Sequence, residues 1–425
     1  MSVAAQQNPL STKLLAISFS YPPLALPRAV QVARLFKHLP FSIVLVCADY
    51  DEKGVRKDST LVAGAEASLE KILRVPFSLS GWRGRLSSVA YRYRLPVWDK
   101  TPDQYRSWKR KVLKRIESFI NESNSLPDAI VSFGSPMSDH LIGAELKRRY
   151  RLPWIAHFSD PWVDNAFNQH DRLTRAFNLS LERKVMTAAD TLIFTSEETV
   201  DLVMSKYPAE LRTKARVLPH AFDASLFPAQ PKQSSSKLQI RYLGDLYGKR
   251  TPQPLFGALR HILTDEPEKL SDVSFELIGP TYDLPPEQLK LETLPEGLVS
   301  LKPPVKYLES LALMADADGL LVIDAPAEKS VFLPSKLIDY VGAGRPILGL
   351  TPPGAASDLI TRLGGWVADP ANAESVAQTI CGFLSFLRQR KNGRTETWGA
   401  ADVRRQYEVC SVTKVFEEIV RETLA

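Results

Sequence analysis

Short apolar runs alternate with helical patterns along almost the whole chain, and this alternation limits the possible folds more than any other feature. The apolar runs are typical of buried strands in a parallel sheet, as in Lys13–Phe19, Ala129–Phe133 and Leu238–Leu243. Parallel strands need long crossover connections, which the intervening helical patterns supply. The sequence therefore predicts an α/β fold built from doubly wound parallel sheets.

The alternation stops once, in the Pro-, Ser- and Gln-rich stretch Phe227–Lys237, and then starts again. A chain of 425 residues is also long for a single domain. We therefore predict two Rossmann-like domains that face each other across a cleft, one over residues 1–228 and the other over residues 238–400. The last segment, residues 403–425, is expected to pack back on the first domain.

The composition is ordinary for a globular enzyme, with 44% hydrophobic and 24% charged residues. Because no run of about 18 apolar residues is present, we expect no membrane-spanning helix. The N-terminal sequence lacks the basic region, apolar core and cleavage site of a signal peptide, which predicts an unprocessed cytoplasmic protein. The three cysteines and six histidines show no metal-ligand spacing, so no metal site is predicted.

Positive charge is concentrated in one segment of the first half. Between Gly81 and Arg151, Lys and Arg outnumber Asp and Glu by 15 to 7, an excess larger than the net charge of +6 of the whole chain. Aromatic residues are interleaved with the basic ones; they are Trp82, Tyr91, Tyr93, Tyr105 and Trp108. This pattern suits the anionic inner face of a membrane, and it equally suits a solvated helix face. Nucleic acid is not expected as a partner, because no nucleic-acid-binding motif accompanies the charge.

The second half contains the segment LPSKLIDYVGAGRPILGL, from Leu333 to Leu350. On a helix, Lys336 and Asp339 share one face and could point together into a cleft. A cation for a diphosphate and a carboxylate for ribose hydroxyls are the groups that a sugar-nucleotide site needs. The alternative is a surface ion pair on a helix that precedes a turn and a strand.

Glycines follow two of the predicted strands in this half. Gly244 is followed by Lys249 and Arg250, and Gly279 by Pro280. A strand-end glycine lets the backbone approach a ligand, and the next helix N-terminus attracts phosphate. The alternative for both segments is an ordinary strand-to-helix turn.

Polar residues follow the strands of the first half as well. Ser159 and Asp160 come directly after the predicted strand Trp154–Phe158, where Asp160 could bind sugar hydroxyls or act in acid–base chemistry. The alternative is an aspartate that caps the next turn. Gly134, with Ser135, follows the neighbouring predicted strand, and Arg28 in the first loop could reach a phosphate or lie on the surface.

Two common nucleotide-binding motifs are missing. The first predicted strand is followed by YPPLALPRA rather than G-x-G-x-x-G, and no P-loop occurs in the chain. Their absence argues against dehydrogenases and ATPases.

Several segments, in order along nearly the whole chain, resemble the GT-B glycosyltransferases, in particular glycosyltransferase family 4 and its branch that makes bacterial surface polysaccharides. In the first half these are SYPPLALPRAVQVARLFKHL and PDAIVSFGSPMSDHLIGAELKRRYRLPWIAHFSDPW. In the second half they are LQIRYLGDLYGKR, FELIGP and LPSKLIDYVGAGRPIL.

The resemblance assigns roles to individual positions. Asp339 stands where the second carboxylate of the family's Glu-x7-Glu pair binds the donor ribose, whereas Val331 stands at the first. Arg250 fits the second of the family's two diphosphate-binding basic positions; Asp245 occupies the first, so that Lys249 would substitute. The family's His-Asp on the acceptor side is Ser159-Asp160 here.

The resemblance implies a glycosyltransferase that moves a sugar from a nucleotide-sugar donor to a lipid-linked or glycan acceptor, with retention at the anomeric carbon and without a metal ion or cofactor, in polysaccharide or glycolipid biosynthesis. The expected catalytic residues are Asp160, Arg250 and Lys336. The expected donor-binding residues are Gly244, Lys249, Arg250, Gly279, Pro280, Ser335, Lys336 and Asp339. The expected acceptor-side residues are Arg28, Gly134, Ser135, Ser159 and Asp160.

Two other functions remain open at this stage. One is a nucleotide-sugar epimerase of the same architecture, and the other is a catalytically silent GT-B protein that binds a nucleotide or glycan. Val331 and Ser159, which replace a carboxylate and a histidine of the family, keep the silent protein in consideration.

Overall fold

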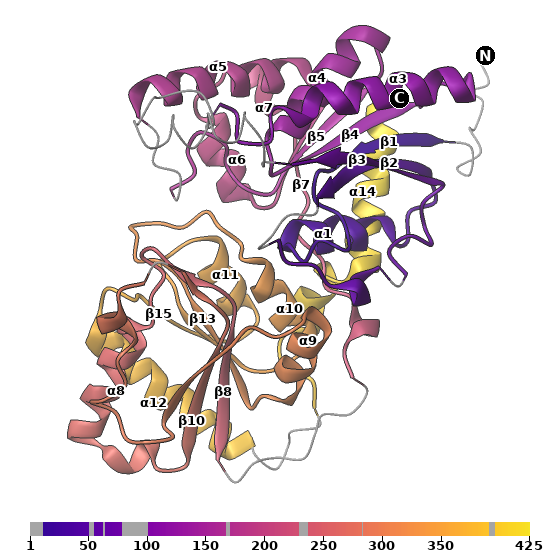
Figure 1. Cartoon of the computed structure of the whole chain (residues 1–425). Helices are drawn as coiled ribbons and strands as arrows, with labels where there is room; N and C mark the ends of the chain where they lie inside the picture. Colours follow the sequence, from indigo (N-terminus) through magenta and orange to yellow (C-terminus); the bar gives the residue numbers. More distant parts are fainter. Residues whose placement is uncertain are drawn as a thin grey trace, which may run out of the picture. The chain divides into compact units, whose positions relative to one another are not determined.

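A computed structural model describes residues 12–50, 55–62, 64–78, 101–166, 171–228, 237–282, 284–390 and 396–425 of the chain (Figure 1). Two structural units are present: the chain up to Pro219 together with Val412–Ala425, and His220–Ser411. Parts of two segments singled out in the sequence lie outside the described residues. They are Trp82, Tyr91 and Tyr93 of the basic segment, and residues 229–236 of the predicted linker.

Within the described residues, the first unit contains a parallel sheet of seven strands in the order β3-β2-β1-β4-β5-β6-β7. The strands are β1 (Lys13–Ile17), β2 (Ser42–Tyr50), β3 (Lys71–Phe77), β4 (Ala129–Gly134), β5 (Trp154–Phe158), β6 (Thr191–Phe194) and β7 (Ala215–Val217). From β1 the sheet grows first toward β3 and then, starting with β4, in the opposite direction. The carboxyl ends of β1 and β4 therefore mark the point where ligands of doubly wound folds bind.

Helices cover both faces of this sheet. Figure 1 shows α3, α4 and α5 over one face, and α1 and α14 over the other. The helices of the unit are α1 (Pro27–Phe36), α3 (Trp108–Ser123), α4 (Ser138–Tyr150), α5 (Arg172–Ala188), α6 (Glu197–Met204), α7 (Ala209–Arg212) and most of α14 (Val409–Leu424). No helix among the described residues is both long enough and apolar enough to cross a membrane.

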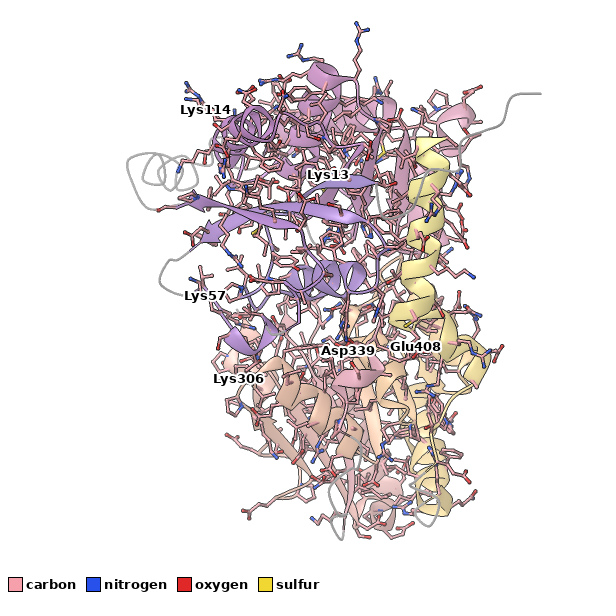
Figure 2. The ribbon with its side chains drawn as sticks, turned by 90° about the vertical axis from the view of Figure 1, so that its right-hand side faces the viewer. Lys13, Lys57, Lys114, Lys306, Asp339 and Glu408 are labelled. Carbon is pink, nitrogen blue, oxygen red and sulfur yellow. The ribbon has the colours of Figure 1, made fainter. Side chains whose placement is uncertain are left out.

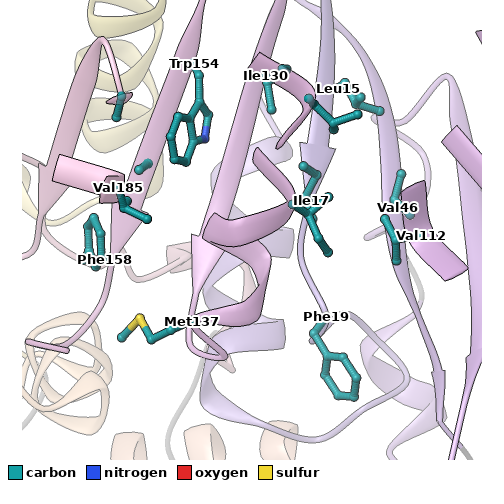
Figure 3. Packing of buried hydrophobic residues seen from close by; sticks show 14 of the residues in the cluster. Leu15, Ile17, Phe19, Val46, Val112, Ile130, Met137, Trp154, Phe158 and Val185 are labelled. Atoms are coloured by element: carbon teal, nitrogen blue, oxygen red, sulfur yellow. The ribbon is translucent and has the colours of Figure 1, made fainter. Parts of the chain in front are cut away.

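The core of the first unit lies between the sheet and its helices. Alternate residues of a strand point to the same face, so Ile17, Ile130 and Trp154 from three neighbouring strands pack in one cluster with Val112 of α3 and Val185 of α5 (Figure 3). All five side chains are buried. This packing fixes the strands, and with them the loops at their carboxyl ends.

The second unit repeats the same architecture. Its sheet has the order β12-β10-β8-β13-β14-β15, and a short parallel pair, β9 with β11, lies apart from it. The strands are β8 (Leu238–Leu243), β9 (Leu246–Tyr247), β10 (Val273–Ile278), β11 (Thr281–Tyr282), β12 (Val299–Lys302), β13 (Gly319–Ile323), β14 (Ile347–Leu350) and β15 (Trp366–Ala368). The helices are α8 (Gln253–Asp265), α9 (Tyr307–Asp316), α10 (Ser335–Ala343), α11 (Ala355–Arg362), α12 (Ala373–Arg390) and α13 (Ala401–Gln406).

Both sheets consist of parallel strands connected through helices. The α/β fold with two doubly wound, Rossmann-like units that the sequence predicts is therefore confirmed. In the second unit the sheet reverses direction between β8 and β13, so its ligand-binding edge lies at the carboxyl ends of these two strands.

Candidate functional site

A glycine follows each of the strands β8 and β10, at a position where the backbone conformation requires glycine. Gly244 has φ +155° and Gly279 has φ +149°, a backbone region that other residues rarely adopt. A Cβ on Gly279 would collide with the carbonyl of Gly244, and a Cβ on Gly244 would collide with the end of the Lys336 side chain. The two glycines thus bring two strand ends and a lysine amine together at one edge of the sheet.

Lys336 lies in the first turn of α10 and reaches back to β8. Its Nζ donates a hydrogen bond of 2.7 Å to Tyr242 Oη and lies 4.2 Å from the centre of the same ring. The Tyr242 hydroxyl in turn donates to the carbonyl of Asp245 at 2.8 Å. One helical turn further along α10, Tyr340 Oη accepts a hydrogen bond of 2.8 Å from Leu243 N. Lys336 and Tyr340, spaced i and i+4, therefore fasten α10 to the end of β8.

The environment of Lys336 lowers the pKa of its amine. Burial, together with the positive charge of Arg250, lowers the pKa of Lys336 from its usual 10.5 to about 7, and the carboxylates of Asp245 and Asp324 only partly oppose this shift. The amine therefore changes charge near neutral pH. An anion bound beside it would favour the charged form.

Arg250 is the second cation at this edge. One of its terminal nitrogens donates to Asp324 Oδ1 at 2.8 Å, and the other donates to Tyr247 Oη at 3.2 Å. Both partners of the ion pair are buried, and Asp324 comes directly after β13. The guanidinium is therefore held in a fixed direction, which suits recognition of a phosphate.

Asp339 is buried in the second turn of α10, where its Oδ1 accepts a hydrogen bond of 3.1 Å from Tyr307 Oη of α9 (Figure 2). The sequence suggests that Lys336 and Asp339 point in a common direction. The structure places them against different partners, Lys336 against β8 and Asp339 against α9.

The remaining donor-side positions surround these groups. Lys249 is exposed in the turn before α8, and Ser335 is the first residue of α10. Pro280 follows Gly279, and its carbonyl accepts a hydrogen bond of 3.0 Å from Leu246 N. All of them lie at or near the carboxyl ends of the strands or at the N-terminus of a helix.

Sequence reasoning missed four residues of this cluster: Tyr242, Tyr247, Asp324 and Tyr340. Asp324 follows an apolar strand, so the rule that led to Asp160 could have found it. The tyrosines of β8 and α10 occupy ordinary core positions in the pattern, and only the structure reveals their hydrogen bonds.

In the first unit, the loop after β5 is bound to the end of β4. Ser159 N donates to the carbonyl of Gly134 at 3.3 Å. Ser159 Oγ lies 3.2 Å from the same carbonyl and 3.0 Å from Asp160 Oδ2, and its single proton can serve either acceptor. Ser135 is exposed beside Gly134. The structure therefore brings Gly134, Ser159 and Asp160 together at one sheet edge.

Arg28, in the first turn of α1, is buried at this edge and does not lie on the surface. One terminal nitrogen meets both the carbonyl and Nδ1 of His157 at 3.0 Å, and the guanidinium lies 5.3 Å from the centre of the Phe133 ring. Burial lowers the pKa of Arg28 to about 10, against the attraction of Asp160 and Asp139. The arginine remains charged at neutral pH and contributes positive charge beside Asp160.

A buried histidine explains the glycine at position 134. His140 lies where a Cβ on Gly134 would be, and its Nδ1 is 2.8 Å from Ser132 Oγ. Ser132 Oγ accepts a hydrogen bond of 2.9 Å from Trp154 Nε1, so the serine can donate to His140 Nδ1. Burial lowers the pKa of His140 to about 3, which keeps the ring neutral. Among the described residues, no group of three or more His, Cys, Asp or Glu side chains is arranged to hold a metal ion.

The chain was compared with protein-family models, with curated protein sequences and with solved structures. Residues 25–219 match the family model described as a glycosyl transferase 4-like domain. A comparison with curated protein sequences gives no match.

Solved structures resemble nearly the whole chain at low sequence identity. Sucrose-phosphate synthase from Thermosynechococcus elongatus has a TM-score of 0.67 at 14% identity, covering 97% of this chain and 98% of that one. The Anabaena protein HepE, in complex with UDP and glucose, has a TM-score of 0.63 at 13% identity, covering 97% and 100%. The lipopolysaccharide outer core galactosyltransferase WaaB has a TM-score of 0.60 at 13% identity, covering 97% and 99%.

At these identities the solved structures establish the fold alone. The chain thus has the fold of the GT-B glycosyltransferases, and its residues 25–219 form a glycosyl transferase 4-like domain.

Proposed function

We propose that the second unit binds a nucleotide-sugar donor, and that the enzyme transfers the sugar to a lipid-linked or glycan acceptor with retention at the anomeric carbon and without a metal ion. The observation that carries this proposal is the cluster of Lys336, Tyr242, Gly244 and Arg250 at the carboxyl ends of the central strands. The cluster combines two basic side chains, the backbone of a glycine and a helix N-terminus in one place.

This cluster suits a diphosphate for electrostatic reasons. When the bond between the sugar and the nucleotide breaks, the departing nucleoside diphosphate gains negative charge. Lys336 and Arg250 are already oriented by Tyr242 and Asp324, so they would stabilise that charge without rearrangement. The diphosphate is already anionic in the bound donor and gains further charge as the bond breaks, so Lys336 should strengthen donor binding and, to a greater extent, accelerate the chemical step.

The other donor-side residues fit supporting roles. Asp339, oriented by Tyr307, would accept hydrogen bonds from the ribose hydroxyls. Gly244, Gly279 and Pro280 would form the surface against which the nucleotide lies. Lys249 and Ser335 would add a cation and a helix N-terminus on the diphosphate side. With Val331 at the family's first carboxylate position, contacts to the sugar itself would come from other groups.

The first unit would hold the acceptor at the edge formed by Arg28, Gly134, Ser135, Ser159 and Asp160. Asp160, whose Oδ2 lies 3.0 Å from Ser159 Oγ, would accept a hydrogen bond from the attacking hydroxyl. Two similar structures support the direction of this proposal: HepE is in complex with UDP and glucose, and WaaB is a lipopolysaccharide outer core galactosyltransferase. We propose that the enzyme acts in polysaccharide or glycolipid synthesis, in the cytoplasm and at the inner face of a membrane.

A transfer assay tests this proposal. The full chain is incubated with UDP-, GDP-, ADP- or TDP-sugars and a panel of lipid-linked sugars, and the product is analysed by mass spectrometry and by NMR of the anomeric proton. We expect one donor to give a product with retained configuration, and Lys336→Ala to lower turnover by about a hundredfold or more. A donor sugar that is isomerised without transfer would point instead to an epimerase. Wild-type turnover in Lys336→Ala would contradict the assigned role.

A further inference from the structure

The outward side of α5 in the first unit carries two large apolar side chains in solvent. Leu173 is 50% exposed and Phe177 is 48% exposed. They are spaced i and i+4, so they are neighbours on one side of the helix. Single exposed apolar residues are common on proteins, but an adjacent pair on one helix face forms a continuous apolar strip.

Basic residues flank this strip. Ser180 and Lys184 are exposed on the same side of α5 as the strip, and Arg172 and Arg183 are exposed along one edge of it, about a quarter turn round the helix from Leu173. We call these four residues, together with Leu173 and Phe177, the α5 outer face. The two acids of the helix region do not balance this charge. Asp171 caps the helix by accepting hydrogen bonds from Leu173 N and Thr174 N, and Glu182 is buried on the opposite side.

More positive charge lies on the same side of the sheet. Helices α3, α4 and α5 cover one face together (Figure 1), and α3 presents Arg110 and Lys114 to solvent; Lys114 is labelled in Figure 2. The α5 outer face is therefore an apolar strip within a positively charged surface.

The opposite side of α5 holds the loop that carries Asp160. Glu182 Oε2 accepts a hydrogen bond of 2.9 Å from Val163 N, and Arg175 donates to the carbonyl of Val163 at 3.0 Å. Asn178 Oδ1 accepts from Trp162 Nε1 at 3.3 Å. Glu182 is itself held by Lys206 and Tyr207, each at 2.6 Å. The helix thus joins the outer face rigidly to the candidate acceptor loop.

We propose that the α5 outer face docks on an anionic lipid bilayer. Leu173 and Phe177 enter the boundary between headgroups and acyl chains, and Arg172, Arg183 and Lys184 contact anionic headgroups. The inference rests on the proposed function in one respect: a lipid-linked acceptor would then be presented beside the loop that holds Asp160. The positive charge of the surface favours an anionic bilayer as the partner, because long cationic side chains beside an apolar strip attract anionic headgroups and not neutral ones.

Vesicle binding of the full chain tests the proposal. The probe is vesicles of 30% phosphatidylglycerol in phosphatidylcholine, with pure phosphatidylcholine for comparison, and the readout is co-sedimentation at low and high salt. We expect binding to the anionic vesicles that weakens with salt. The double variant Leu173→Glu/Phe177→Glu should bind about tenfold more weakly or worse. Arg183→Glu/Lys184→Glu should also bind at least tenfold more weakly, since each basic residue lost near the surface weakens partition about fivefold.

The variants are designed so that a folding defect is not mistaken for lost docking. Position 173 lies in the first turn of α5, where a glutamate interacts favourably with the helix dipole. The matched control is Leu126→Glu, because Leu126 is 47% exposed and belongs to the loop between α3 and β4, not to α5. It should bind vesicles like the wild type.

Three results would overturn the proposal: no binding of the wild type to anionic vesicles, equal binding of the α5 double variants, or equal loss of binding in Leu126→Glu. Nucleotide-induced stabilisation of the same variants separates this proposal from the proposed function. Intact vesicle binding in a protein that no nucleotide sugar stabilises would support the docking surface and refute the donor site. The reverse pattern would refute the docking surface alone.

Discussion

The residue on which donor binding would depend most is Lys336, a lysine that is held in place before any ligand binds. Lys336 Nζ is held by a hydrogen bond to Tyr242, and the positive charge of Arg250 acts on it. Two nearby cations repel each other in the free protein, and a diphosphate would remove that repulsion. Binding of the donor should therefore be coupled to protonation of Lys336.

The sign of this coupling follows from the pKa. In the free protein, Lys336 loses its proton as the pH rises through about 7, whereas a bound diphosphate keeps it charged. The affinity for the nucleotide sugar should fall about tenfold per pH unit above 7 and level off below it. Calorimetric titration in buffers of different ionisation enthalpy should show uptake of about one proton at pH 8 and much less at pH 6. A pH-independent affinity, or the same proton uptake in Lys336→Ala, would contradict this role.

Among the secondary-structure elements, the central strands and the edge strands β7 and β15 could be predicted from the sequence, whereas the edge strands β3 and β12 could not. β1, β4, β5, β8, β10 and β13 are apolar runs buried on both faces, which makes their pattern unmistakable. β3 (KILRVPF) and β12 (VSLK) lie at sheet edges, and their half-exposed, charged sequences give no comparable signal. Such strands are specified by pairing with a neighbour, which a single sequence does not show.

The start of the second unit illustrates the same limit. The Pro-rich break begins at Phe227, yet the second unit already begins at His220. Phe222 explains why, because its N–H donates to the carbonyl of Tyr407 and its carbonyl accepts from Val409 N, each at 2.9 Å. Its ring also packs against Gly342 of α10. Contacts between residues so far apart in the chain leave no trace in local composition.

Some residues of the candidate sites could be predicted from the sequence, and others could not. Strand-end positions such as Gly244, Gly279 and Asp160 follow from the rule that parallel sheets bind ligands at their carboxyl ends. Tyr242 and Tyr340 could not be found this way, since an inward-facing tyrosine looks like core until its hydroxyl partner is known. The turn after β8 therefore combines a feature visible in the sequence, the glycine, with one that only the structure reveals.

This turn allows a prediction at the scale of elements. Gly244→Ala should strain the backbone at φ +155° and displace Lys336 from Tyr242. We expect a loss of stability of about 1–3 kcal/mol and a much weaker response to nucleotide sugars. Thermal unfolding with and without the ligand measures both effects.

The matched control is Gly257→Ala in α8, where a Cβ would meet no atom within 4 Å. In a helix this change should stabilise the protein by about 0.5–1 kcal/mol and leave ligand binding unchanged. If Gly244→Ala responded to the ligand like Gly257→Ala, the assigned geometry of the turn would be wrong.

At the scale of the whole molecule, the chain consists of two doubly wound units in tandem, each with polar groups at the carboxyl ends of its central strands. The first unit gathers Arg28, Ser159 and Asp160, and the second gathers Arg250 and Lys336. The family match covers the first unit, and the GT-B fold covers almost the whole chain. The cations of the second unit have positions fixed by Tyr242 and Asp324, which is why we assign the donor to that unit.

The most direct test of this assignment is the change in melting temperature of the full chain with UDP-, GDP-, ADP- and TDP-sugars, measured for the wild type, Lys336→Ala and Lys290→Ala. Lys290 is an exposed lysine of the same unit and serves as the control. A ligand that binds the folded state raises its stability, so we predict that at least one nucleotide sugar stabilises the wild type and Lys290→Ala equally. Loss of a charged contact should make Lys336→Ala bind the same ligand about tenfold more weakly. No stabilisation by any of the four, or equal stabilisation of all three proteins, would contradict the account.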